Sequence, residues 1–200
     1  ARPVLRCVPD AAEARIAFLS WDTEGGEKAG VNLLRAGQGA AILIAAGDGW
    51  RDAALRGRRA EGNATVYEIE AGPVRLEWRI EPDPETGILA LRISWPSSSG
   101  ASSPSALRLV FPFDPKVTST SVLPAAWLED ETFRLPAVVN APDFGPMLLV
   151  ESSGRALAGR LEGSRAKKTV DLLLDLPEIA PGRPVSLSLS PLRLPAPAGL

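Results

Sequence analysis

This 200-residue sequence contains no histidine and only one cysteine. The missing histidines exclude a Ser-His-Asp triad, a Cys-His pair, an imidazole general base and a histidine-ligated zinc. A single cysteine, Cys7, excludes an internal disulfide and a CxxC redox or metal motif. Any chemistry must therefore come from carboxylate, arginine, lysine, hydroxyl and amide side chains, or from the five tryptophans.

An excess of charge and a long apolar run are also missing. The formal net charge is −2, whereas a nucleic-acid surface would show a basic excess. The best apolar run, Ala40–Ala46, is far shorter than the ~18 residues of a membrane-spanning helix. We therefore expect neither a nucleic-acid nor a membrane partner. The sequence starts at Ala1 with no visible leader, which is expected of a mature form, so the cellular compartment stays open.

Alternation of apolar and polar residues with a period of two dominates the sequence. In Pro73–Glu81 one face carries only apolar side chains and the other only charged ones, and Ile88–Trp95 repeats the pattern. Such alternation is typical of strands with one buried and one wet face. The intervening Pro82–Gly87 has the proline and glycine of a tight turn, so the two segments predict a hairpin.

The same signals recur along the chain, and helical periodicity is almost absent. About a dozen short strands separated by turn residues predict an all-β protein, a two-sheet antiparallel β-sandwich with little helix. The only helix candidates are Pro9–Ala14 and Trp50–Leu55. We expect one domain over residues 1–194, and the Pro/Ala-rich residues 195–200 as the start of a linker to a downstream domain. The further strands are expected near Ile16–Trp21, Ala41–Ala46, Ala64–Glu70, Ala106–Phe113, Val117–Val122, Met147–Ser152, Ala156–Gly163, Thr169–Leu176 and Val185–Leu194.

Three short motifs match known catalytic signatures only in part. Asp143-Phe144-Gly145 spells the kinase magnesium motif, but an HRD loop is impossible without histidine, so we interpret Asn140–Pro146 as a turn. Ser164–Lys167 fits SxxK without the later KTG strand, which favours a hairpin loop. Gly37-Gln38-Gly39 precedes an apolar strand and lacks a third glycine, which argues against dinucleotide binding.

Acidic loops follow two of the tryptophans. Asp22, Glu24 and Glu27 follow Trp21, and a run of three acids at 129–131 follows Trp127. An oxygen-only calcium site is the one metal option compatible with the absence of histidine, but no EF-hand spacing is present and solvated loop charge is favoured. We therefore expect no cofactor, with calcium as the alternative. Paired-carboxylate catalysis needs a separation of ~5 to 9 Å, which a sequence does not supply.

The tryptophans fall into two groups. Trp78 and Trp95 lie on the apolar phase of alternating strands, which predicts core packing. Trp21, Trp50 and Trp127 lie beside acidic or glycine-rich residues. An aromatic ring next to hydrogen-bonding carboxylates commonly holds a sugar, because the ring stacks on the sugar's C–H face while the hydroxyls find acceptors. Plugging the edge of the core is the alternative for these three.

Several segments of the second half resemble a known family. They are Phe111–Thr118, Val122–Pro124, Leu135–Gly145, Arg160–Arg165 and Lys168–Leu172. Together they resemble the N-terminal β-sandwich domain of bacterial glycoside hydrolases whose catalytic part is an (α/α)₆ barrel. That domain is often a supersandwich like that of galactose mutarotase. The resemblance covers about 106–200 by motif and the rest by strand pattern only.

The resemblance implies where the chemistry lies. In these enzymes the acid and base carboxylates belong to the barrel, so no catalytic residue is carried over to this chain. Mutarotases use histidines, whose absence argues against that activity. The loops Asn140–Pro146 and Trp127–Asp130 are the expected contacts with sugar or barrel. The candidate binding or interdomain residues are therefore Trp21, Trp50, Trp127, Glu129, Asp130, Asn140, Asp143 and Phe144.

Three functions stay open at the level of sequence. The leading hypothesis is a non-catalytic sandwich domain of a glycoside hydrolase, packed on its catalytic barrel and in contact with sugar at one edge. The second is an autonomous carbohydrate-binding module. The third is a small hydrolase that uses carboxylates alone, for which Asp143 or Glu129 would be essential.

Overall fold

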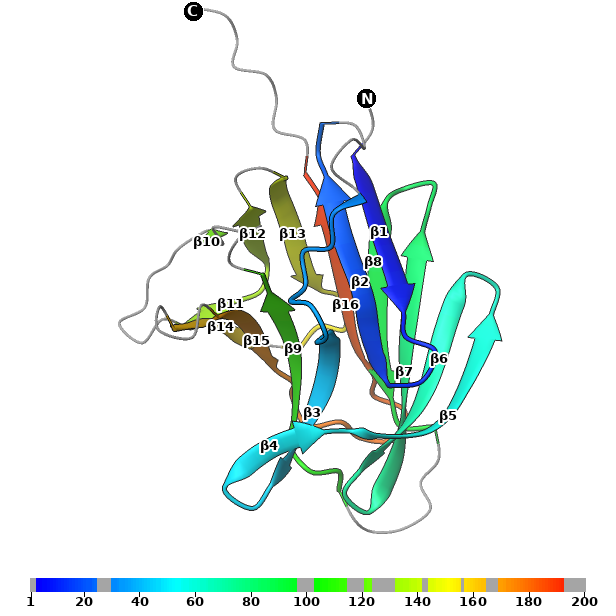
Figure 1. The fold of residues 1–200 in the computed structure, drawn as a ribbon. Coiled ribbons are helices and arrows are strands. Elements are labelled where there is room, and N and C mark those ends of the chain that lie inside the picture. The colour runs from blue at the N-terminus through cyan, green and yellow to red at the C-terminus, as the bar shows by residue number, and fades with distance from the viewer. Residues whose placement is uncertain are drawn as a thin grey trace, which may run out of the picture.

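A computed structural model describes residues 3–24, 30–96, 103–114, 121–123, 132–141, 144–155, 157–164 and 169–192. Within these ranges the chain forms sixteen β-strands and no α-helix (Figure 1). The strands belong to two sheets in which all neighbours are antiparallel. The prediction of an all-β, two-sheet antiparallel sandwich is therefore confirmed.

The first sheet has the strand order β1-β2-β3-β9-β15-β14-β11, and β4 also pairs with β3. Its strands are β1 (Val4–Pro9), β2 (Arg15–Asp22), β3 (Ala40–Ala46), β4 (Gly49–Asp52), β9 (Leu107–Phe113), β11 (Thr132–Arg134), β14 (Ala158–Ser164) and β15 (Thr169–Asp175).

The second sheet has the strand order β10-β12-β13-β16-β8-β7-β6-β5. Its strands are β5 (Ala54–Glu61), β6 (Ala64–Ala71), β7 (Val74–Asp83), β8 (Ile88–Ser94), β10 (Ser121–Leu123), β12 (Ala137–Ala141), β13 (Gly145–Glu151) and β16 (Val185–Pro191).

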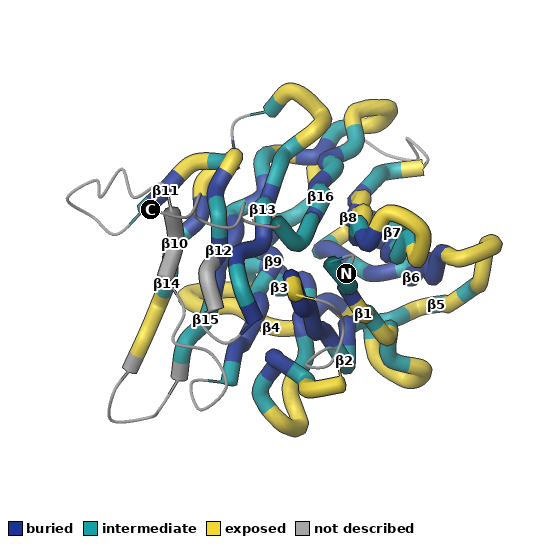
Figure 2. The backbone as a smooth tube through the Cα atoms, turned by 90° about the horizontal axis from the view of Figure 1, so that it is seen from above, coloured by how far each residue is buried: buried dark blue, intermediate teal, exposed yellow. Residues whose placement is uncertain are grey.

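The core lies between the sheets, because most of the longer strands turn an apolar face inward. In β7 and β9 the inward positions are fully or almost fully buried while the intervening charged ones are exposed or half-buried. Aromatic rings from both sheets fill this layer, among them Tyr67, Trp78, Phe111 and Phe113. Figure 2 shows the buried stretches between the two sheets, with the exposed turns around them.

The predicted hairpin between β7 and β8 is confirmed. Trp78 lies opposite Ile93, and Ile80 lies opposite Leu91. Gly87 takes a positive φ of 71° in the turn, where a residue with a Cβ would be strained. Ser164 lies opposite Thr169, and residues 165–167 of the hairpin loop expected at Ser164–Lys167 lie outside the described residues.

Both helix predictions are wrong. Pro9 ends β1, and residues 11–14 form a bend. The segment 50–55 contains the end of β4 and the start of β5. Gly47, with φ 57°, turns the chain so that β4 folds back on β3, and this pairing overrides the local pattern.

Five strands carried no strand prediction: β1, β4, β5, β11 and β12. β5 was not recognised because a register shift between Leu55 and Gly57 interrupts its alternation, and its charged residues fall on both faces: Arg58 lies opposite Tyr67, and Arg59 lies opposite Val66. β12 and β11 are only five and three residues long. The expected strand Val117–Val122 overlaps β10, but residues 115–120 lie outside the described residues.

Candidate functional site

A groove of about 590 Å³ lies on the outer face of the first sheet. Its floor consists of Ala41 and Leu43 from β3 together with Val110 and Pro112 from β9. In β3 the intervening Ile42 points into the core and is 1% exposed, so alternation turns Ala41 and Leu43 outward. We call this surface the outer groove.

One wall of the outer groove is the turn between β1 and β2, which contributes residues 12–15. The Asp10 carboxylate holds this turn, because Ala12 N and Glu13 N donate to its Oδ1 at 2.7 and 3.1 Å. Arg15 Nε donates to the other carboxylate oxygen at 3.2 Å. The backbone hydrogen bond from Ala12 is the main reason why the pKa of Asp10 is lowered.

The second sheet also anchors this wall. The Tyr67 hydroxyl donates to the backbone carbonyl of Asp10 and lies 3.2 Å from that of Arg15. Its ring is fully buried beside Trp78, with ring centroids 5.8 Å apart. Burial raises the pKa of Tyr67 to about 12, so the hydroxyl remains a donor at neutral pH.

The turn at Gly37–Gly39 lines the outer groove as well. Gly39 is required by a close approach, because a Cβ there would lie 2.7 Å from the backbone oxygen of Ile16. Just before this turn, Arg35 donates to Asp171 of β15 and, at 2.9 Å, to Gln38 Oε1. The ion pair joins the turn to the floor of the outer groove.

Trp50 continues the same face beyond the end of the outer groove. Leu43 lies opposite Asp52 and Ala45 lies opposite Trp50, so Trp50 and Asp52 project on the side of the groove floor. Trp50 is 38% exposed, which is unusual for so large an apolar side chain.

Arg108 of β9 fixes the indole of Trp50. Its guanidinium carbon lies 4.0 Å from the ring centroid, within the range of a cation–π contact. Arg108 Nε in turn donates to Asp175 at 2.6 Å. The Asp175 carboxylate also accepts from Arg160 at 3.4 Å. Trp50 is therefore covered on one ring face and held in place there.

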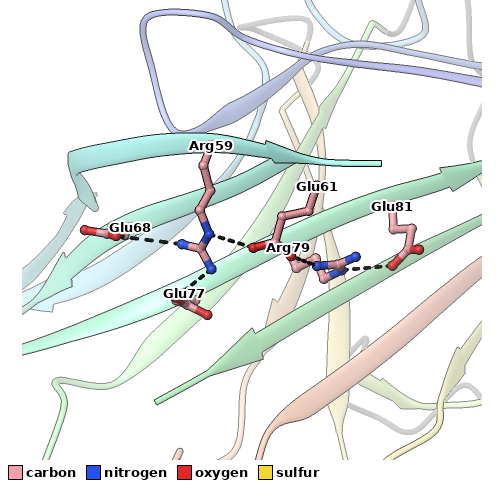
Figure 3. A network of polar contacts seen from close by, with 6 residues as sticks. All are labelled: Arg59, Glu61, Glu68, Glu77, Arg79 and Glu81. Atoms are coloured by element: carbon pink, nitrogen blue, oxygen red, sulfur yellow. Dashed lines mark hydrogen bonds and ion pairs between the residues drawn. The ribbon is translucent and has the colours of Figure 1, made fainter. Parts of the chain in front are cut away.

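The outer face of the second sheet is chemically different (Figure 3). Six charged side chains from β5, β6 and β7 form what we call the charged ladder: Arg59, Glu61, Glu68, Glu77, Arg79 and Glu81. Arg59 donates to Glu61 at 2.7 Å and to Glu77 at 2.8 Å, and lies 3.7 Å from Glu68. Arg79 pairs with Glu61 and, at 2.9 Å, with Glu81.

Trp21, a candidate binding residue in the sequence, lies in the core. Its side chain is 0% exposed, and its Nε1 donates to the backbone carbonyl of Gly145 at 2.9 Å. Its ring meets Phe113 edge-on at 6.0 Å. A ring with no exposed surface cannot stack on a sugar, so the alternative prediction, that Trp21 plugs the edge of the core, fits its position.

Phe144 is brought close to Trp21. It is 6% exposed, and its carbonyl accepts from Thr23 N at 3.2 Å, which links the first sheet to the second. Gly145 has φ 86°, as the turn interpretation of this motif predicted. Asn140 lies in β12 opposite Pro146. Trp127, Glu129, Asp130 and Asp143 lie outside the described residues.

Metal and nucleophile candidates are few. Within the described ranges no group of three metal-ligating side chains comes together, and no helix is long and apolar enough to cross a membrane. Burial raises the pKa of Cys7 to about 12, so its thiol is protonated at neutral pH. Cys7 is therefore no nucleophile in this environment.

Sequence reasoning found Trp50 but missed its surroundings. Asp52 was considered only as an acidic neighbour of Trp50 in the sequence, and Arg108 was not singled out. The spacing Trp50-x-Asp52, interpreted as strand, would have put both on one face. Arg108 was not recognisable in any case, because it reaches Trp50 only through the pairing of β3 with β9.

No family model and no curated protein matches this sequence. Among solved structures, a polysaccharide lyase superposes with a TM-score of 0.54 and 15% identity over 94% of this chain and 32% of that one. A 4-alpha-glucanotransferase from Thermococcus litoralis gives a TM-score of 0.46 and 11% identity over 93% of this chain and 35% of that chain. The chain thus spans about a third of the length of either protein. At this identity the first likeness establishes the class of fold, an antiparallel β-sandwich.

Proposed function

We propose that this chain is a non-catalytic β-sandwich domain of a carbohydrate-active enzyme, which binds carbohydrate at the outer groove beside Trp50 and packs on the enzyme's catalytic domain. The observation that carries the proposal is the position of Trp50. A half-exposed indole, held on one ring face by Arg108, lies on the same sheet face as an apolar floor and the Asp52 carboxylate. An exposed aromatic ring beside hydrogen-bond acceptors is suited to a sugar ring.

Two further observations support an accessory role. The sequence has no histidine, and Cys7 is protonated at neutral pH, which leaves few groups for catalysis. The fold is shared with a segment of a polysaccharide lyase about three times as long, so a domain of this kind occurs inside a larger carbohydrate-active enzyme. The resemblance to the sandwich of (α/α)₆-barrel glycoside hydrolases agrees with an accessory role, and it suggests that the carbohydrate-active enzyme is a glycoside hydrolase.

The alternative is an autonomous carbohydrate-binding module. It is favoured by the same outer groove, because Trp50, Asp52, Arg108 and the groove floor all belong to this chain. The two functions differ in affinity. A module that works alone needs measurable binding of free glycans, whereas a domain that contacts sugar together with a catalytic partner binds them more weakly by itself.

The experiment is a titration of the chain with a panel of oligosaccharides, followed by tryptophan fluorescence and calorimetry. We expect binding of at least one oligosaccharide, and at least a roughly tenfold loss of affinity in Trp50→Ala, as for a buried aromatic anchor. Arg92→Ala, on the exposed outer face of the second sheet, is the control and should bind as the wild type does. Unchanged binding by Trp50→Ala would reject the outer groove as the site.

A further inference from the structure

We propose that the outer groove selects uncharged sugar residues and rejects uronates, an inference that rests on the proposed carbohydrate site. Three carboxylates, those of Glu13, Asp52 and Asp171, face the outer groove together with one guanidinium, that of Arg15. A ligand in the outer groove therefore meets a net negative surface.

The arginines near the outer groove already have carboxylate partners. Arg15 lies 3.2 Å from Asp10 and 2.8 Å from Glu13, and Arg35 pairs with Asp171. A uronate is usually recognised by a free guanidinium, which forms two parallel hydrogen bonds with the ligand's carboxylate. In this chain an incoming uronate would have to displace an internal carboxylate from each guanidinium.

Arg108, next to Trp50, is also engaged. Its Nε donates to Asp175 at 2.6 Å, and its guanidinium plane covers one face of the Trp50 ring. Its side chain is only 12% exposed, so little of the guanidinium remains for a ligand. The cation beside Trp50 thus orients the indole and is not a free anion site.

Asp52 is different from the other acids of the outer groove. It is exposed, and within the described part of the chain its carboxylate has neither an ion pair nor a hydrogen bond. It projects from the same face of β4 as Trp50, two residues along, at about 7 Å by strand geometry. This separation suits one sugar ring that stacks on the indole while its hydroxyls donate to the carboxylate.

Asp52 therefore determines that the outer groove prefers uncharged sugars to uronates. Hydroxyl groups of an uncharged sugar donate to a carboxylate in a short, charge-assisted hydrogen bond. A uronate in the same place would put a like charge within a few ångströms of Asp52, and this repulsion is weakly screened at low ionic strength. Discrimination of about tenfold or more is expected from one such contact.

The test measures neutral and acidic hexasaccharides side by side at low salt, with tryptophan fluorescence and calorimetry. The neutral probes are cello-, xylo-, manno- and maltohexaose, and the acidic probes are hexagalacturonate and hexamannuronate. We expect at least one neutral probe to bind about tenfold or more tightly than either uronate. Tighter binding of a uronate by the wild type would overturn the inference but leave the proposed carbohydrate site standing.

Two variants test whether Asp52 causes the preference for neutral sugars. Asp52→Lys should weaken binding of the neutral probe and strengthen binding of the uronates, which narrows or reverses the preference. Asp48→Lys changes the net charge equally on an exposed turn outside the outer groove, so it should leave the preference unchanged. An equal effect of the two variants would overturn the role of Asp52. Absence of binding by every probe would reject the proposed site and, with it, this inference.

Discussion

The outer groove and the charged ladder lie on the outer faces of the two sheets of one sandwich, and their side chains differ in kind. On the first sheet the outward positions of β3 and β9 are largely small or apolar, and charged pairs surround them. On the second sheet the outward positions of β5, β6 and β7 are mostly charged and pair among themselves. The same strand alternation thus produces one face suited to a ligand and one suited to water.

The difference has a physical cause. Exposed ion pairs such as those of the charged ladder contribute little to stability, but they keep a sheet face solvated and discourage edge-to-edge pairing of β5. An apolar floor gains free energy when a ligand covers it. We infer that the face with the outer groove is the functional one.

The largest loss of stability is expected when a side chain is added at Gly39, where β3 approaches β2 closely. Gly39→Ala places a Cβ 2.7 Å from the backbone oxygen of Ile16, so β2 and β3 must move apart. We expect a loss of about 2 kcal/mol in the free energy of unfolding, in the range of overpacking, together with weaker glycan binding. Gly49→Ala is the matched control, because a Cβ there meets open space. Urea unfolding measures both, and equal stabilities would contradict the prediction.

A smaller effect is expected when the second sheet loses its hold on the groove wall. Tyr67→Phe keeps the buried ring but removes the hydroxyl that donates to the Asp10 carbonyl. The expected cost is about 1 kcal/mol, because one buried hydrogen bond is lost. For a chain of this size this corresponds to a lowering of Tm by about 2 to 4 °C, measurable by calorimetry. A normal Tm would show that the hydroxyl does not anchor the turn.

A pair of arginine substitutions compares the two faces directly. Arg108→Ala should release the Trp50 ring, alter its fluorescence and lower glycan affinity several-fold, because an unfixed indole loses entropy on binding. Arg59→Ala in the charged ladder should leave glycan affinity unchanged. The side chain of Arg108 is 12% exposed, against 39% for Arg59, so the first substitution should also cost more stability. Equal effects on binding would contradict the distinction between the faces.

The smallest effect concerns pH. The side-chain hydrogen bond from Arg59 lowers the pKa of Glu61 below its usual 4.5, and that of Asp10 lies below 3.8 chiefly through the amide of Ala12. Because the folded-state pKa values are lowered, their contribution to stability is complete above the usual values and is lost as pH falls through the lowered ones. The free energy of unfolding, measured by denaturation between pH 6 and about 2, should therefore decrease as the pH falls. Arg59→Ala should reduce the contribution of Glu61 to the dependence of the free energy of unfolding on pH. If the stability difference between the two proteins does not change with pH, this assignment to Glu61 is wrong.

The fold was largely predictable where a strand has one apolar face. The hairpin of β7 and β8 and the strands β2, β3, β6, β9 and β15 follow from alternation, with boundaries within one or two residues. Prediction failed where the pattern is weak or reversed. β4 has no buried residue, and β5 carries charged residues on both faces around a register shift, so neither shows an apolar face in the sequence.

The candidate site was predictable only as single residues. Trp50 was selected for its acidic and glycine-rich neighbours, and it does lie on an exposed face. Trp21 was selected for the same reason but is buried, because its end of β2 packs against Gly145 of the other sheet. Local sequence does not distinguish the two tryptophans, since their exposure depends on strands far away in the chain.

The class of fold and the excluded kinds of chemistry follow from the amino-acid sequence alone. Alternation with a period of two is a local property of strands, and a missing histidine is missing in any fold. Which side chains meet depends instead on how the strands are ordered and packed. Arg108 covers Trp50, and Tyr67 holds the turn at Asp10, through contacts between residues that are 57 or 58 positions apart. Such contacts depend on strand order and sheet packing, and these are set by burial of the whole core.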